Sequence, residues 1–177
     1  MKRNTYSFLQ RKHARGLTFI ELLIAIIVIL IVSAMAVAGG MKLLGKSDSS
    51  ADFQATAQLM TNTKSMRGNS GYGTAGTNLV PGLIQLDAVP AGITVTGNKL
   101  YNKYGGEITV VSTGLGTTTT SNQVPKESCI ESASKLAGGR MVTKINGGTA
   151  VTGEMLPAVA ATSCTTDSNT IVWTTPN

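Results

Sequence analysis

The chain has 177 residues, of which 15 are Lys or Arg and 9 are Asp or Glu, so its formal net charge is +6. Residues 1–16 hold a third of these basic residues, the only histidine (His13) and no acid, so the remainder is nearly neutral and nucleic acid is not expected as a partner. With two cysteines and no histidine, that remainder cannot build a Ser-His-Asp or Cys-His nucleophile or the usual His/Cys zinc site. Its carboxylates beyond residue 100 form no recognisable acid/base pattern. We therefore expect a protein that is not an enzyme, with no cofactor and no metal.

A long apolar run follows the basic segment. Residues 22–41 contain no charged side chain, and a helix of that length spans about 30 Å, enough to cross the hydrocarbon core of a bilayer. In a secretory signal peptide the cleavage site lies beyond the apolar core. Here Gly16 precedes the run, so a cut at Gly16 would remove the basic residues and keep the apolar helix.

Glu21 is an acid placed just inside this run. A carboxylate at the centre of a bilayer costs roughly 2.5–3.5 kcal/mol on insertion scales, so it needs a partner. If the chain starts at Leu17, its new amino group lies four residues before Glu21, on the same side of the helix. When identical helices bundle, Glu21 of one subunit could neutralise the Leu17 amine of a neighbour and set the axial offset between them.

The processing site of type IV prepilins is similar to the segment Arg15-Gly16-Leu17-Thr18-Phe19-Ile20-Glu21-Leu22-Leu23. The resemblance implies a membrane-embedded prepilin peptidase that cuts between Gly16 and Leu17 and N-methylates Leu17. Leucine as the first mature residue and a leader as long as residues 1–16 resemble the type IVb subgroup. The motif covers the N-terminal third of the chain, and the remainder agrees with the family in general layout.

We expect one long helix over residues 17–67. Its first part, 17–41, is apolar all round and would lie in the membrane and later in a filament core, through the side chains of Phe19, Leu22, Leu23, Ile26, Ile27 and Leu30. Gly39 and Gly40 each cost about 1 kcal/mol in a helix interior. They indicate either close packing against a neighbouring helix or a soft point at which the helix unwinds on assembly.

The second part of the helix, residues 42–67, is amphipathic. One stripe at helical spacing should pack on a sheet: Leu44, Ala51, Ala55, Leu59 and Met66. A second stripe lies to one side and either joins the core of the same subunit or contacts another: Phe53, Ala57 and Met60. Gly68 and Asn69 then stop the helix.

Residues 68–177 are expected to form one globular domain, in which a sheet of antiparallel strands packs against the long helix. The chain is thus of the α+β class, with the type IV pilin fold that the resemblance implies. We expect two further helices, one begun by Pro81 and one from Pro125 to Leu136. Strands are predicted over residues 93–96, 100–101, 108–112, 140–145 and 171–175. Loops are predicted over 70–78, over 114–121, with its four consecutive threonines exposed, and over 156–166.

The only two cysteines are Cys129 on the predicted helix and Cys164 before the last strand. In a domain outside the cytoplasm such a pair indicates a disulfide, the alternative being two buried thiols. Closing a loop of about 36 residues would stabilise the domain by roughly 4 kcal/mol in the chain-entropy model. In the pilin family such a disulfide borders a variable, exposed edge called the D-region.

Resemblance to type IVb pilins implies a structural subunit that leaves the inner membrane and polymerises into a surface fibre of a Gram-negative bacterium. The partners implied are further copies of the chain, the prepilin peptidase, a cytoplasmic assembly ATPase, a platform protein and an outer-membrane secretin. Such fibres serve adhesion, bacterial aggregation or conjugative mating. Two alternatives stay open: a minor pilin or type II secretion pseudopilin, which share the cut site, and a signal-anchored envelope protein that never polymerises.

Overall fold

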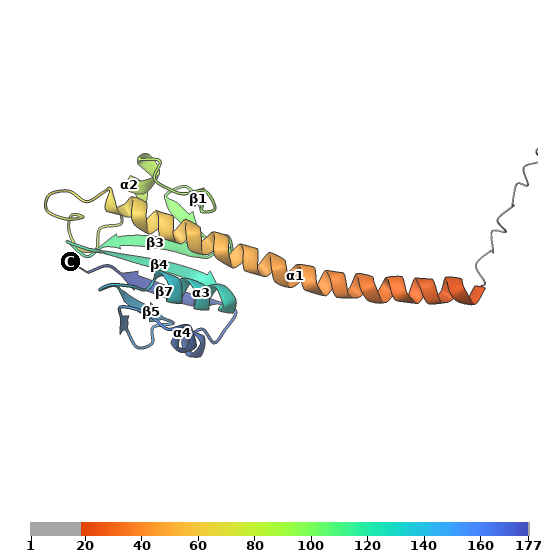
Figure 1. The fold of residues 1–177 in the computed structure, drawn as a ribbon. Coiled ribbons are helices and arrows are strands. Elements are labelled where there is room, and N and C mark those ends of the chain that lie inside the picture. Colours follow the sequence, from red (N-terminus) through yellow and green to blue (C-terminus); the bar gives the residue numbers. More distant parts are fainter. Residues whose placement is uncertain (1–18, 177) are drawn as a thin grey trace, which may run out of the picture. The chain divides into compact units, whose positions relative to one another are not determined.

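The fold was described from a computed structural model, which gives the backbone of residues 19–176 and the side chains of residues 19–30 and 48–176. The chain divides into two units, Met1–Leu43 and Leu44–Asn177. Helix α1 (Phe19–Lys64) begins in the first unit and ends in the second. The second unit holds a sheet and three further helices (Figure 1).

The sheet of the second unit has seven strands in the order β1-β2-β3-β4-β7-β5-β6, and every neighbouring pair is antiparallel. Its central strands are β3, β4 and β7. The strands are β1 (Thr94–Thr96), β2 (Lys99–Tyr101), β3 (Glu107–Ser112), β4 (Thr117–Val124), β5 (Val142–Ile145), β6 (Val151–Thr152) and β7 (Asn169–Thr174). The predicted α+β class, with an N-terminal helix and an antiparallel sheet, is confirmed.

One face of this sheet carries the core. Side chains along a strand alternate between the two faces, and the register aligns Val110 of β3 with Trp173 of β7 through β4. The domain part of α1 covers one half of that face, where Leu59 packs in a cluster with Val110. Helix α3 (Lys126–Leu136) covers the other half, where Cys129 packs in a second cluster with Trp173. Both helices therefore lie on the same side of the sheet.

The helix begun by Pro81 is confirmed as α2 (Val80–Gln85), and the helix that follows Pro125 is confirmed as α3. Two short elements were missed, in addition to β4. The predicted loop over residues 156–166 contains α4 (Pro157–Ser163), and β6 pairs with β5. Helix α4 is seven residues long, mostly Ala, Val, Thr and Ser, with one fully buried side chain, Ala160. Such a short segment gives too little periodicity to be distinguished from a loop.

The prediction of an exposed polar loop around the four threonines was wrong. They begin β4, which pairs with β3 on one side and β7 on the other. Threonine is β-branched and favours strands, and its polarity had suggested exposure. Thr117 and Ser121 point into the core face and are buried, but their hydroxyls are satisfied by Thr175 and by the amide of Asn102.

The face of α1 that meets the domain is more polar than its predicted apolar stripe. Ala55 and Leu59 are buried as expected, whereas Ala51 is exposed, and Leu44 lies outside the residues with described side chains. The buried side chains between residues 48 and 64 also include four polar ones: Ser49, Asp52, Thr56 and Thr63. The second predicted stripe is half-buried, and its Met60 packs against the core cluster beneath α3.

Thr143 on β5 allows a test of how much an unpaired hydroxyl destabilises the core. It is fully buried, and its Oγ1 has no hydrogen-bond partner in the described part of the chain. Thr143→Val replaces that hydroxyl by a methyl group of the same shape, so we expect the unfolding free energy to rise by about 1–3 kcal/mol. Urea unfolding followed by the fluorescence of Trp173, the only tryptophan, measures it.

Thr117→Val is the matched control for this substitution. The Thr117 hydroxyl lies 3.0 Å from that of Thr175, so its loss should lower the unfolding free energy by about 1 kcal/mol. A Thr143→Val protein less stable than the unsubstituted chain would contradict the assignment of an unpaired hydroxyl.

Candidate assembly segment and its attachment to the domain

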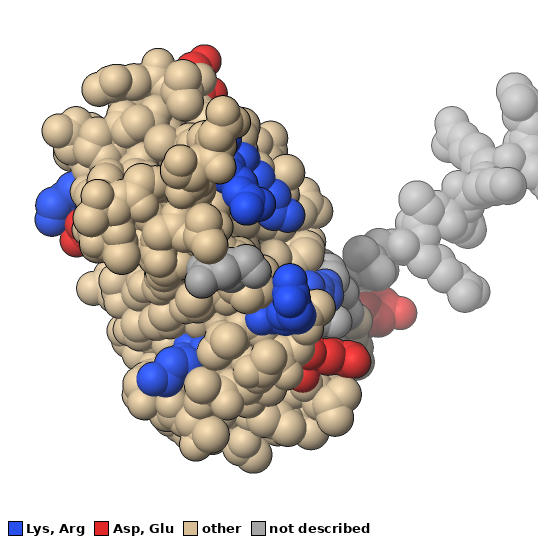
Figure 2. Space-filling model, turned by 90° about the vertical axis from the view of Figure 1, so that its left-hand side faces the viewer, with Lys and Arg blue, Asp and Glu red and all other residues tan. Residues whose placement is uncertain are grey.

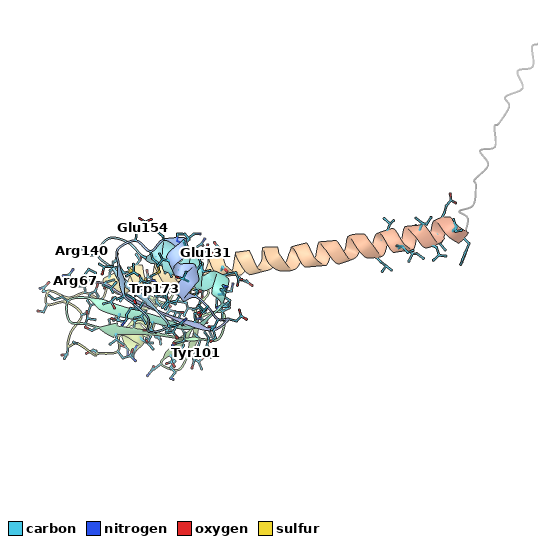
Figure 3. All side chains as sticks on the ribbon, turned by 90° about the horizontal axis from the view of Figure 1, so that it is seen from below. Arg67, Tyr101, Glu131, Arg140, Glu154 and Trp173 are labelled. Carbon is cyan, nitrogen blue, oxygen red and sulfur yellow. A yellow bond between two sulfur atoms is a disulfide. The ribbon has the colours of Figure 1, made fainter. Side chains whose placement is uncertain are left out.

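The first described turns of α1 expose an unusual amount of apolar surface. Ten large apolar side chains between residues 19 and 30 are exposed, from 43% for Leu23 to 78% for Phe19. The predicted filament-core residues are all among them: Phe19, Leu22, Leu23, Ile26, Ile27 and Leu30. Figure 3 shows these side chains projecting from several sides of the helix. Apolar surface of this extent marks a site that contacts a membrane or other protein chains.

Glu21 lies in the first turn of α1 and is exposed. A carboxylate there is favoured by the positive end of the helix dipole. Gly16 and Leu17, the predicted cleavage site, lie outside the described residues. The predicted apolar span over residues 22–41 lies partly outside them too, because side chains are described only to residue 30 in this stretch. Within the described residues, no helix contains an apolar stretch long enough for a membrane span.

The backbone of α1 is helical through Gly39 and Gly40. The proposed soft point concerns the assembled state, so it stays a prediction.

Two polar contacts fasten α1 to the domain near residue 48. The Lys103 ammonium, in the turn after β2, donates to the Asp48 carboxylate at 2.6 Å and to the Asp48 carbonyl oxygen at 2.8 Å. The Ser128 hydroxyl on α3 lies 2.7 Å from the Ser49 hydroxyl and 2.6 Å from that of Tyr104. The start of the domain part of α1 is thus tied both to the β2–β3 turn and to α3.

Asp52 is the one acidic side chain buried in the described part of the chain, 5% exposed and one helical turn beyond Asp48. Burial raises its pKa to about 6, although the Lys103 ammonium opposes the rise. Burial also raises the pKa of Tyr104, its hydrogen bond with Ser128 lowers it, and the Asp52 charge raises it further. These groups form one electrostatic cluster where α1 meets the domain.

This cluster was not predicted from the sequence. The signal was present, because residues 49, 52, 56, 59 and 63 follow the 3.6-residue period of one helix face. The predicted stripe included only apolar side chains, so Asp52 was not predicted to be buried. Lys103 and Tyr104 lie more than fifty residues away in a turn, and only the folded chain brings them to α1.

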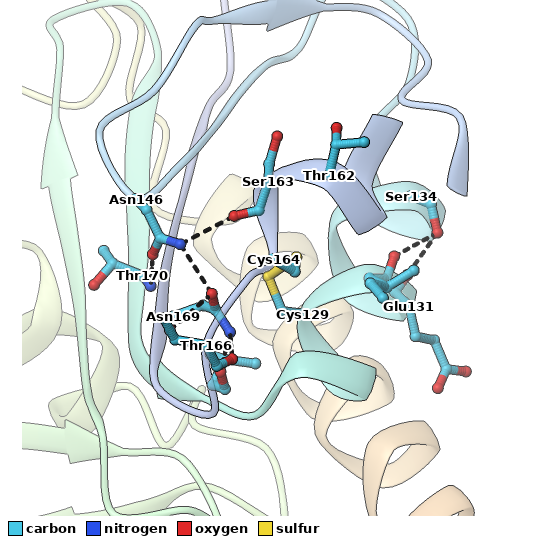
Figure 4. Close-up of a disulfide and its surroundings, with 12 residues drawn as sticks. Cys129, Glu131, Ser134, Asn146, Thr162, Ser163, Cys164, Thr166, Asn169 and Thr170 are labelled. Carbon is cyan, nitrogen blue, oxygen red and sulfur yellow. Dashed lines mark hydrogen bonds between the residues drawn. A yellow bond between two sulfur atoms is a disulfide. The ribbon is translucent and has the colours of Figure 1, made fainter. Parts of the chain in front are cut away.

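Directly after Ser128, Cys129 forms a disulfide with Cys164 that joins α3 to the segment before β7, as predicted (Figure 4). Both Cys129 and Cys164 are fully buried. The same segment is held by Asn146, whose amide nitrogen donates to the Ser163 carbonyl and to the Asn169 side-chain oxygen at 3.1 and 2.8 Å. Asn169 in turn donates to the Val124 carbonyl at 3.0 Å. The disulfide and the two asparagines thus connect α3, β4, α4 and the β5–β6 turn.

Side chains that could hold a metal ion do not gather in threes anywhere in the described residues. The described residues instead show three structural features. The start of α1 exposes apolar side chains, polar contacts hold α1 to the β2–β3 turn and to α3, and a disulfide joins α3 to the segment before β7.

Comparison with known families agrees with this architecture. The family described as PilS N terminal matches residues 46–176, and the prokaryotic N-terminal methylation motif matches residues 11–37. No curated protein matches the chain. Both families are typical of type IV prepilins, so the protein is type IV pilin-like. Because the first match covers well over half of the chain, the chain belongs to the PilS family.

The methylation motif implies processing by a prepilin peptidase, membrane insertion and then assembly into a pilus. Membership of a pilin family points to a structural protein and not to an enzyme.

Proposed function

We propose that this chain is the major structural subunit of a type IVb pilus and polymerises through the apolar start of α1. The observation that carries the proposal is the exposure of ten large apolar side chains between residues 19 and 30. Burying one Leu or Ile side chain is worth about 1.5–3 kcal/mol. Packing many copies of this helix together therefore gives a large driving force, and a contact that repeats without closure generates a fibre.

We propose that the subunit exists first as a prepilin in the membrane and then as a mature subunit in a filament. As a prepilin with residues 1–16 attached, it lies in the inner membrane, with residues 68–177 as the globular domain outside the cytoplasm. The prepilin peptidase then cuts between Gly16 and Leu17 and methylates the Leu17 amine. The mature helix, residues 17–67, contributes its part 17–41 to the filament core and uses its part 42–67 to hold the domain.

Export is proposed to use a cytoplasmic assembly ATPase, an inner-membrane platform protein and an outer-membrane secretin, which places the fibre on a Gram-negative surface. There the fibre would serve adhesion, bacterial aggregation or conjugative mating. The N-terminal methylation motif over residues 11–37 supports the first step of this route.

Mass spectrometry of sheared surface fibres tests the proposal. A major subunit dominates such a sample and gives an N-terminal peptide that begins at methylated Leu17. A minor pilin or a pseudopilin would be processed in the same way but would be scarce in the fibres. A signal-anchored protein would be absent from them, and an abundant fibre protein that retains residues 1–16 would contradict the cleavage.

Glu21→Ala tests the pairing of Glu21 with a neighbour's Leu17 amine. We expect processing to continue while the yield of fibres falls at least tenfold, because an uncompensated amine in the apolar core opposes assembly. Glu127→Ala is the matched control, since Glu127 also lies in the first turn of a helix and is exposed. Quantitative blotting of fibre and membrane fractions provides the measurement. Normal fibre yield with Ala at residue 21 would contradict the pairing.

A further inference from the structure

A pocket of about 370 Å³ lies where α1 ends, beside the residues that follow β7. It is within the ~300–1,000 Å³ range of small-ligand sites. Its apolar lining comes from Met60, Tyr72, Leu115 and Pro176. Figure 2 views the domain from the side on which α1 ends and shows separate patches of Lys and Arg on a mostly uncharged surface.

The backbone segments that line this pocket lie close to one another. The Tyr72 amide donates to the Gly114 carbonyl at 2.7 Å, and a Cβ added to Gly71 would lie 2.4 Å from the same oxygen. A Cβ added to Gly116 would lie 2.2 Å from the Thr175 carbonyl oxygen. The Thr175 hydroxyl accepts from the Thr117 amide at 2.8 Å. A side chain at either glycine would therefore push apart the backbone segments that line this pocket.

Two cations, Lys64 and Arg67, line the pocket, and its lining includes no acid. In the described part of the chain neither forms an ion pair. A second pocket, of about 470 Å³ beside β2 and β3, differs in this respect. There Lys99 is paired with Glu107 at 3.2 Å, so its positive charge is balanced within the protein.

We propose that the Lys64/Arg67 pocket binds a pyranose that carries a carboxylate, such as a sialic or uronic acid residue of a surface glycan. The guanidinium of Arg67 offers paired donors that match a carboxylate, and the Lys64 ammonium adds a second charge. Met60, Leu115 and Tyr72 offer apolar surface for the C–H face of a sugar ring. This site lies in the domain and does not depend on the proposed assembly.

Lys64 also lies in the last turn of α1, where a cation is favoured by the negative end of the helix dipole. That role accounts for Lys64 alone. Arg67 lies beyond the helix, where the dipole has little effect, and faces the same pocket. Binding measurements separate the two roles, because a purely structural cation would change stability and leave ligand affinity unchanged.

The test uses the full chain dispersed in a mild detergent, so that it needs no fibre. Chemical shifts of the Arg67 side chain and the Thr117 amide are followed by NMR during titration with N-acetylneuraminic acid, glucuronic acid, glucose or acetate. We expect saturable shifts with at least one of the two acidic sugars, and affinities at least tenfold lower for glucose and for acetate. The double variant Lys64→Gln/Arg67→Gln should weaken acidic-sugar binding at least tenfold.

Lys99→Gln in the balanced pocket is the matched control and should leave the affinity unchanged. Leu115→Glu, at an exposed wall position, places a negative charge before the cations and should abolish binding without altering α1. It therefore keeps the test decisive if the double variant fails to fold. Absence of saturable shifts with both acidic sugars, equal affinity for glucose or acetate, or unchanged affinity in Leu115→Glu would each overturn the proposal.

Discussion

Replacing both Cys129 and Cys164 by Ala is expected to lower the unfolding free energy of the domain by about 4 kcal/mol. The disulfide links residues 35 positions apart, and in the chain-entropy model a loop of that size restricts the unfolded chain by about this amount. A loss of this size is a large part of the roughly 5–15 kcal/mol that stabilises a typical domain. The segment from α4 to β7 should be the first to open, because α4 buries only Ala160 fully.

The measurement is urea unfolding of the detergent-dispersed chain, followed by the fluorescence of Trp173. This tryptophan is 1% exposed and lies in the same core cluster as both cysteines (Figure 3). The unsubstituted chain treated with a reductant is the control: it loses the cross-link but keeps both sulfur atoms, so the difference between the two samples isolates the packing loss. A double variant within 1 kcal/mol of the oxidised chain would contradict the prediction.

Asp52→Asn is expected to raise the unfolding free energy at pH 7 by about 3 kcal/mol. Burial raises the pKa of Asp52 from the usual value of 3.8 to about 6, and each pKa unit corresponds to about 1.4 kcal/mol. Because the folded-state pKa is above the unfolded one, this residue opposes folding only when it is ionised. The ionisation of Asp52 therefore costs no unfolding free energy below about pH 3.8. The cost grows as the pH rises towards 6 and stays constant above that value.

Urea unfolding between pH 3.5 and 7.5, followed again by Trp173, gives the comparison for Asp52. The difference in unfolding free energy between Asp52→Asn and the unsubstituted chain should grow as the pH rises through this window. Because both proteins contain the other carboxylates, taking the difference removes their contributions. Asp48→Asn is the matched control, because Asp48 lies one turn away and contacts the same Lys103 but is exposed. A difference that does not change with pH would show that Asp52 is hydrated in the folded protein.

The N-terminal features were predictable from the sequence because each depends on residues close together in the chain. The apolar character of residues 22–41 and the position of Glu21 five residues after Gly16 need no tertiary contact to be recognised. Pro81 and Pro125 marked two helix starts for the same reason. The disulfide was predictable because the sequence contains only two cysteines, Cys129 and Cys164.

The errors arose where burial is decided by distant segments. The threonines of β4 are polar, but a strand on each side pairs with their backbone, and Thr175 contacts the buried hydroxyl of Thr117. The helical period groups Asp52 with the buried residues of α1, but its charged and polar neighbours Lys103 and Tyr104 come from a distant turn that no local pattern connects to α1. The Lys64/Arg67 pocket is likewise formed by segments more than a hundred residues apart.

The sheet ends in β1 and β6, which are only three and two residues long. A long edge strand offers rows of unpaired N–H and C=O groups on which other chains can build amyloid. These short edges leave few such groups on the domain. Cross-β pairing between neighbouring domains is therefore disfavoured, even where many copies of the chain are concentrated together.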